Sequence, residues 1–259
     1  MSGLRTYTSN GVATIEWSNP AKRNALTLEM ALELAQKVTQ LAEDPQVLVI
    51  VLQGEGTKAF CAGGDISQMQ SQESSENSGI AIAKAWGVAC TAIENSRAPV
   101  IAKIHGVCMG GGLGLAASCD LRLCADDARF GIPAARLGIG YPVEDVRKLV
   151  ALIGGQHALD IFCTARTFGA GEALNMGFVC RVAPSGELET ALAAMTDAIV
   201  ENAPLTLRAV KLAVQCSLQP SDEGLAAAIA AQAACADSDD NREGVRAYLE
   251  KRKPRFRGE

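Results

Sequence analysis

The 259-residue sequence contains only two histidines, His105 and His157, and aromatic residues make up just 4% of it. So few imidazoles leave little room for a metal site of the histidine-rich kind. None of the nine cysteines forms a C-x-x-C pair, and their number is odd. These features favour free thiols in a reducing compartment over a disulfide framework, and we expect no metal site.

The chain also lacks an excess of basic charge and a long apolar run. It carries 24 Lys and Arg against 29 Asp and Glu, which argues against a nucleic-acid partner that needs a basic face. The most apolar stretch, residues 225–236, is interrupted by Gln232 and is too short to cross a membrane. The polar start, residues 1–5, does not resemble a signal peptide. We therefore expect a cytoplasmic protein with neither a nucleic-acid nor a membrane partner.

Strand-like and helix-like segments alternate over the first part of the chain. A hairpin is predicted around Asn10-Gly11, a dipeptide suited to a tight turn, and buried strands are predicted at 47–52, 100–104 and 121–124. Helices are predicted at 27–42 and 80–95 between them. This alternation indicates an α/β layer fold. Further on, helices follow one another, at 187–202, 205–217, 222–236 and 242–251.

Two turns rich in small residues each follow a buried strand, at 60–66 (FCAGGDI) and 106–114 (GVCMGGGLG). The second turn lacks both G-x-G-x-x-G spacing and a Gly-Lys-Ser/Thr ending, which disfavours a phosphate-binding loop of either type. Glycines at a helix start leave backbone N–H groups that favour a developing negative charge. The two turns therefore suit an oxyanion hole built from backbone amides, or else close packing of strand on helix.

Motifs spread over nearly the whole chain resemble the crotonase (enoyl-CoA hydratase/isomerase) superfamily. The matching segments are 19–26 (NPAKRNAL), 60–66, 106–120, 130–133 (FGIP), 164–166 (TAR), 172–179 (EALNMGFV), 243–244 and 250–256 (EKRKPRF). The resemblance implies a spiral of ββα units, here residues 1–195. It also implies a helical C-terminal region, residues 196–259, that builds a homo-trimer or a dimer of trimers.

The resemblance further implies an acyl-CoA thioester as substrate, with coenzyme A part of that substrate and no cofactor tightly bound. By position in the motifs, the oxyanion-hole donors are the N–H groups of Ala62 and Gly111. The residues implied in coenzyme A binding are Lys22, Arg23, Ala25, Ala62, Gly63, Asp65 and Ile66, with Lys253 and Phe256 of the basic tail. A solvated terminus is the other interpretation of that tail.

The sequence departs from the hydratases of this family at two positions. Gly114 and Ala134 stand where hydratases have the two glutamates that act on water, and neither residue can transfer a proton. The candidates that remain are Tyr141 and Glu144, with Asp145 ranked below them. Packing is the alternative role for Tyr141, and stabilisation of a helix start is the alternative for the two acids.

The expected activity is stabilisation of a thioester enolate, assisted by Tyr141 or Glu144. A Leu-Gly-x-x-Tyr run at 137–141 also resembles a decarboxylase of the family, and decarboxylation needs no pair of groups to activate water. Hydrolysis of a thioester and binding without turnover stay open as alternatives.

Overall fold

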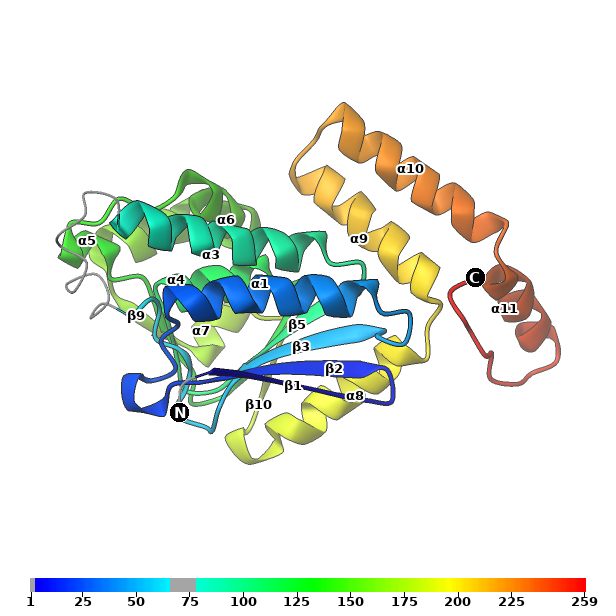
Figure 1. The fold of residues 1–259 in the computed structure, drawn as a ribbon, viewed down its shortest axis with the longest axis horizontal. Helices are drawn as coiled ribbons and strands as arrows, with labels where there is room; N and C mark the ends of the chain where they lie inside the picture. The colour runs from blue at the N-terminus through cyan, green and yellow to red at the C-terminus, as the bar shows by residue number, and fades with distance from the viewer. Residues whose placement is uncertain (1–2, 66–77) are drawn as a thin grey trace.

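The computed structural model describes residues 3–65 and 78–259, and Figure 1 shows their arrangement. A six-stranded sheet has the order β1-β2-β3-β5-β7-β10, and a four-stranded sheet has the order β4-β6-β8-β9. The larger sheet consists of β1 (Gly3–Ser9), β2 (Val12–Ser18), β3 (Val49–Gly54), β5 (Val100–Ile104), β7 (Leu121–Ala125) and β10 (Arg181–Ala183). The smaller consists of β4 (Ala59–Cys61), β6 (Val107–Met109), β8 (Arg129–Gly131) and β9 (Thr167–Gly169).

The predicted hairpin is confirmed. β1 and β2 pair antiparallel, and Asn10 (φ 50°) and Gly11 (φ 79°) both adopt the left-handed backbone that the tight turn requires. From β2 onward, neighbouring strands of the large sheet run parallel. Parallel strands covered on both faces need apolar side chains on both, and β3 is accordingly buried along its whole length.

The main core lies between the large sheet and helices α1 (Leu28–Glu43), α3 (Ser78–Asn95) and α4 (Gly111–Ser118). A smaller core lies between the opposite face of the large sheet and α8 (Leu188–Val200). Figure 1 shows α1 and α3 above the sheet and α8 below it. Successive residues of β3 point to opposite cores, Val49 to the smaller and Ile50 to the larger. The α/β layer fold is therefore confirmed.

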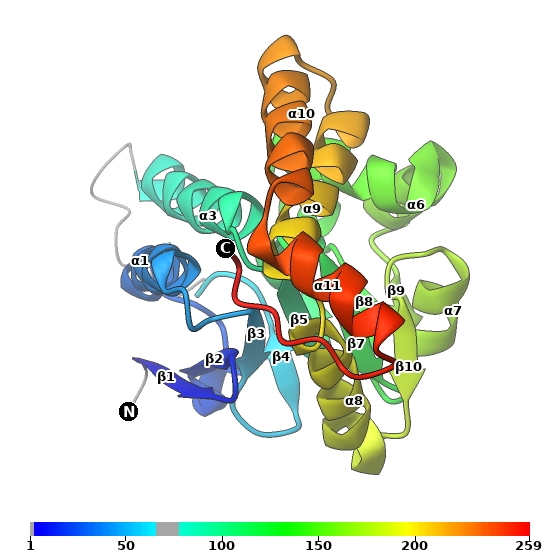
Figure 2. The ribbon, with the colours of Figure 1, turned by 90° about the vertical axis from the view of Figure 1, so that its right-hand side faces the viewer.

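The C-terminal helices extend away from the two sheets, as Figures 1 and 2 show. α9 (Pro204–Leu218) and α10 (Asp222–Ala236) form a hairpin, and α11 (Asp239–Leu249) leads into the terminal segment. Lys211 of α9 forms an ion pair with Asp120 at 2.8 Å, and Gln215 donates to the Glu94 carbonyl at 2.6 Å. These contacts hold α9, the first of the C-terminal helices, against the core.

The remaining helical elements lie before α1 and between β8 and α8 in the chain. They are η1 (Pro20–Lys22), α5 (Ala134–Leu137), α6 (Val143–Thr164), α7 (Ala170–Asn175) and η2 (Ser185–Glu187). α6 is broken at Gly154, whose φ is 78°. Within residues 3–65 and 78–259, no helix has the length and apolarity needed to cross a bilayer.

The start of α4 packs against the end of β4 so closely that the backbones touch. A Cβ added to Gly112 would lie 2.3 Å from the Cys61 carbonyl oxygen, inside any permitted contact. At Gly114, two residues on, an added Cβ would meet its nearest neighbour at 3.5 Å, an ordinary contact. Only the first of these glycines is therefore required by close backbone approach.

This difference predicts opposite effects of two alanine substitutions in one short helix. Gly112→Ala should lower the free energy of unfolding by about 1–3 kcal/mol, because the carbonyl it meets cannot move aside. Gly114→Ala, the matched control, should be neutral or stabilising by up to about 1 kcal/mol. Urea unfolding followed by circular dichroism measures both, and equal midpoints would contradict the proposed packing constraint.

Candidate active site

The loop before α1 is held in place by the side chain of Asn24. Asn24 has a left-handed backbone (φ 57°), and its amide nitrogen donates to the carbonyls of Ala59 (2.7 Å) and Glu55 (2.9 Å). Its amide oxygen accepts from the Asn19 N–H at 3.1 Å. Asparagine tolerates this backbone region better than most residues, and the bonds attach the loop to β4.

The first glycine turn pairs with this loop like a short strand, and the Ala62 N–H makes one of the hydrogen bonds of this pairing. The Ala62 N–H donates to the Arg23 carbonyl at 3.1 Å. It is therefore not a free donor, contrary to its expected place in an oxyanion hole. The sequence could not show this, because the acceptor lies 39 positions away in an irregular loop.

The free amide of this turn belongs to Gly64. Leu26 donates to the Gly63 carbonyl and accepts from the Asp65 N–H, both at 3.0 Å, which makes Leu26 and Gly64 an isolated parallel bridge. In such a bridge the central residue directs its own N–H away from the paired segment. The Gly64 N–H accordingly has no hydrogen-bond partner among residues 3–65 and 78–259.

The second glycine turn starts α4 and leaves its first amides open. Gly110 adopts φ 53° and ψ −122°, a backbone that favours glycine, and its N–H donates to the Gly131 carbonyl at 2.9 Å. The next amides, of Gly111 and Gly112, find no acceptor in the described part of the chain. They are the unpaired donors expected at a helix start, where the helix dipole favours negative charge.

The two turns lie against each other beneath one indole ring. A Cβ built on Gly63 would lie 3.5 Å from the Gly111 nitrogen, so the two backbones are neighbours. Trp86 of α3 packs over both turns: a Cβ on Gly111 would lie 2.9 Å from its ring, and one on Gly64 would lie 3.6 Å from its Nε1. The geometry places two unpaired backbone amides beside an apolar cover.

The expected coenzyme A residues in the N-terminal loop border this site. Lys22 is exposed and forms an ion pair through Nζ with Asp65 Oδ2 at 2.6 Å, while Asp65 is itself buried. Arg23 is also exposed, and Ala25 is buried. The structure thus gathers two cations at the rim. Ile66 lies outside the described residues.

Tyr141 lies at the second turn, but its hydroxyl proton is engaged in a hydrogen bond within the protein. Its hydroxyl donates to the Gly110 carbonyl at 3.0 Å, and its ring packs edge-on against Phe162. Burial raises the pKa of Tyr141, and the nearby Asp145 charge raises it further. Glu144, by contrast, is exposed on the first turn of α6 and makes no hydrogen bond or ion pair with the described residues.

Asp145, which the sequence analysis ranked below Glu144, faces Gly114. A Cβ on Gly114 would lie 3.5 Å from the Tyr141 hydroxyl and 3.7 Å from Asp145 Oδ2. The signal available in the sequence was the spacing of Tyr141 and Asp145, four residues apart. Ala134 is buried in the main core at the start of α5.

The basic tail lies far from these turns within one chain. Figure 1 places the terminal segment at the opposite end of the long axis from η1. Lys253 pairs with Glu201 at 2.6 Å, and Phe256 packs on α11 at Gly244. The structure therefore does not bring these two expected binding residues to Gly64 and Gly111.

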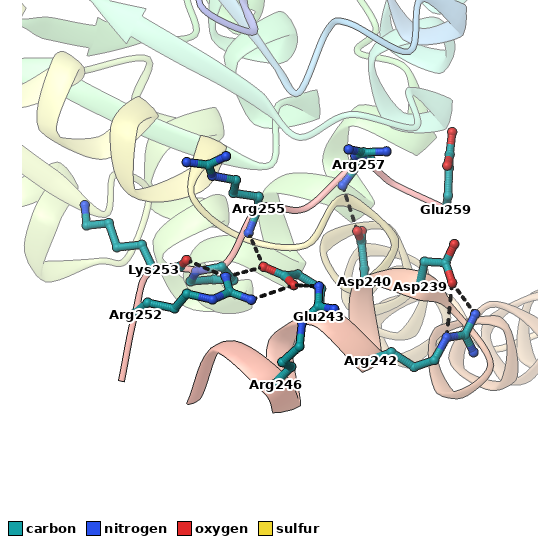
Figure 3. Close-up of a pocket in the computed structure, with 11 residues that line it drawn as sticks. Asp239, Asp240, Arg242, Glu243, Arg246, Arg252, Lys253, Arg255, Arg257 and Glu259 are labelled. Carbon is teal, nitrogen blue, oxygen red and sulfur yellow. Dashed lines mark hydrogen bonds and ion pairs between the residues drawn. The ribbon is translucent and has the colours of Figure 1, made fainter. Parts of the chain in front are cut away.

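The tail is held to α11 by carboxylates, as Figure 3 shows. Glu243 accepts from the Arg252 guanidinium and from the Arg255 N–H, and the bonds from Arg252 and Arg246 lower the pKa of Glu243. Asp240 accepts from the N–H groups of Arg257 and Gly258. These bonds give the segment a defined path, which a solvated terminus does not require.

All nine cysteines are free, as predicted. Burial raises the pKa of Cys61, beside the first turn, to about 12, which keeps its thiol protonated. Among residues 3–65 and 78–259, no three His, Cys, Asp or Glu side chains are grouped as metal ligands.

A model of the enoyl-CoA hydratase/isomerase family matches residues 7–259. The chain belongs to this family. It is 34% identical to a peroxisomal Δ(3,5)-Δ(2,4)-dienoyl-CoA isomerase of Arabidopsis thaliana over 98% of this chain and 95% of that protein. It is 32% identical to a short-chain-enoyl-CoA hydratase of Clostridium acetobutylicum, over 93% and 92%.

Solved structures agree with this membership. The crystal structure of an enoyl-CoA hydratase/carnithine racemase from Magnetospirillum magneticum superposes with a TM-score of 0.93 at 30% identity, covering 100% of this chain and 97% of that one. The superfamily resemblance and the crotonase fold are therefore confirmed. The relatives' names span hydration and isomerisation, so family membership alone leaves the reaction open.

Proposed function

We propose that this protein binds an acyl-CoA thioester and stabilises its enolate between the N–H groups of Gly64 and Gly111. The observation that carries the proposal is the pair of unpaired amides on two touching turns, both covered by Trp86. Fixed backbone dipoles aimed at a developing oxyanion need no reorganisation during the reaction. Gly64 replaces Ala62 in this role because the Ala62 amide is bonded to Arg23.

Coenzyme A enters as part of the substrate, bound along the N-terminal loop. The exposed cations of Lys22 and Arg23 suit its phosphates, and the backbone around Ala25, Gly63 and Asp65 borders the path toward the amides. Relatives named for enoyl-CoA and dienoyl-CoA substrates support this ligand class. A cytoplasmic location stays a prediction, since one of those relatives is named as peroxisomal.

A homo-trimer, alone or paired, would bring the tail to a substrate. The terminal segment, which carries Lys253 and Phe256, lies at the opposite end of the long axis from η1 (Figure 1), so we propose that these two residues serve a neighbouring copy. The C-terminal hairpin carries apolar side chains that are more than half exposed and suit such an association. They are Val210, Val214, Leu218, Leu225 and Ile229.

Glycine and alanine at positions 114 and 134 favour reactions that need an enolate but no pair of carboxylates acting on water. Double-bond isomerisation is one such reaction. Decarboxylation of a malonyl-type thioester is the second candidate, because loss of carbon dioxide generates the enolate directly. Both depend on the same two amides.

The amide role predicts a contrast between two substitutions at Gly64. Gly64→Pro removes the N–H and should lower the rate of α-proton exchange of a bound thioester in D2O by about 10²–10³-fold. Gly64→Ala keeps the N–H, and among residues 3–65 and 78–259 an added Cβ would meet only Trp86 and Ile82, at 3.6 and 4.0 Å, so exchange should persist. Exchange is read by mass spectrometry and binding by calorimetry. Wild-type exchange in Gly64→Pro would contradict the role.

The proposed assembly is tested by sedimentation equilibrium. The wild-type protein should sediment as three or six 27.0 kDa chains, and Val214→Asp on the exposed face of α9 should reduce the mass, because a charge is costly in an apolar interface. A wild-type protein that sediments as a single chain would contradict the assembly.

A further inference from the structure

Asp145 of α6 places a carboxylate beside Gly114 of α4, which has no side chain of its own. Gly114 projects no side chain, and the space where its Cβ would stand is bounded by Asp145 Oδ2 at 3.7 Å and the Tyr141 hydroxyl at 3.5 Å. We propose that Asp145 is the proton-transferring residue of this enzyme and that Lys148 is the residue that positions it. The inference rests on the proposed function.

The two oxygens of Asp145 face different surroundings. Oδ1 pairs with Lys148 Nζ at 3.2 Å, while Oδ2 faces Gly114. The side chain is 21% exposed, so the carboxylate is neither sealed in the core nor fully solvated. Oδ1 is therefore anchored, and Oδ2 faces α4 at Gly114, one helical turn after Gly111.

Lys148 is itself held rigidly, which distinguishes this pair from a surface ion pair. Its Nζ lies 2.7 Å from the Glu94 carboxylate of α3 and donates to Ser118 Oγ of α4 at 3.1 Å, and its side chain is only 12% exposed. Ser118 in turn donates to the Gly114 carbonyl at 3.2 Å. The positions of three helices thus fix the ammonium group, and through it Asp145.

The neighbouring candidates are less suited to the task. The Tyr141 hydroxyl donates to Gly110, and burial raises its pKa, so it neither releases nor offers its proton readily. Glu144, one residue earlier on α6, is exposed and lacks any such anchor. Asp145 is the carboxylate that the structure places beside the glycine.

A single carboxylate suffices for a proton shift within one substrate. Asp145 takes a proton from the α-carbon of a 3-enoyl thioester, and the C–H electron pair forms a double bond between the α-carbon and the thioester carbon while the carbonyl electrons move to the oxygen. The oxygen of this dienolate accepts from the N–H groups of Gly64 and Gly111. The resulting carboxylic acid then returns the proton to the γ-carbon, the carbonyl re-forms, and the double bond moves to the α,β position of a 2-enoyl thioester. Nothing is oxidised or reduced, and no water is consumed.

The test uses trans-3-hexenoyl-CoA, with isomerisation followed by absorbance, deuterium uptake in D2O by mass spectrometry, and binding of acetoacetyl-CoA by calorimetry. Asp145→Asn should lower isomerisation and deuterium uptake at least about 100-fold while binding persists. Glu43→Gln, which alters an exposed acid at the end of α1, is the matched control and should retain the wild-type rates. Circular dichroism confirms that each variant is folded.

The outcomes separate the two proposals. Wild-type rates in Asp145→Asn, or loss of turnover in Glu144→Gln instead, would each overturn the assignment of Asp145 and leave the proposed function in place. A wild-type protein that binds the thioester without exchange would overturn the assignment and also the enolate-stabilising part of the proposed function. A wild-type protein that does not bind acetoacetyl-CoA would overturn the proposed function itself.

The positioning role of Lys148 has a separate readout in the split between kcat and KM for isomerisation. Lys148→Met removes the ammonium group that holds Asp145 Oδ1, so it should lower kcat while KM stays near the wild-type value. Lys148→Arg keeps a cation at this place and should retain most of the rate. A wild-type kcat in Lys148→Met, or a rise in KM alone, would overturn the role.

Discussion

The contact of α4 with the end of β4 is the constraint on which the site depends. Gly112 meets the Cys61 carbonyl with no room for a side chain, which brings the two glycine turns together. Because the backbones touch there, Gly63 lies beside the Gly111 nitrogen and both turns fit beneath Trp86. The position of the two amides that we propose bind the enolate is therefore a consequence of how a helix packs on a strand. In our proposal the oxyanion hole and the close packing, which the sequence left as alternatives, are one feature.

The proposed site uses backbone amides, so it places few demands on side chains. Gly114 and Ala134, the positions at which we expect a hydratase to have glutamates, take no part in the contact between the two turns, which involves Cys61, Gly63, Gly111 and Gly112. The group that transfers a proton is then free to come from another element. In our proposal Asp145 on α6 reaches the space beside Gly114, anchored by a lysine that three helices hold.

Much of the fold could be predicted because periodic burial leaves a clear pattern. The strand at 100–104 and the helix at 222–236 were predicted with the bounds that the structure shows, since each contains an apolar run. The small sheet was not predicted. Its strands are three residues long, too short for any alternation of apolar and polar residues to be recognised.

The sequence identifies the two glycine turns but does not show which individual amides and carboxylates face the space between them. Ala62 and Gly64 are equivalent in a one-dimensional reading, and only the pairing with Arg23 and Leu26 shows which amide is free. Glu144 and Asp145 are adjacent acids at one helix start, and only the packing of α6 beside Gly114 distinguishes them. The place of the terminal segment at the far end of the long axis is likewise a property of the whole fold (Figure 1).

The central claim is that the amides of Gly64 and Gly111 bind the thioester oxygen. A crystal structure with acetoacetyl-CoA bound measures this most directly. We predict that the thioester oxygen lies about 3 Å from both nitrogens, with the Ala62 amide still bonded to Arg23. A thioester oxygen placed elsewhere, or bonded to the Ala62 nitrogen, would contradict the account.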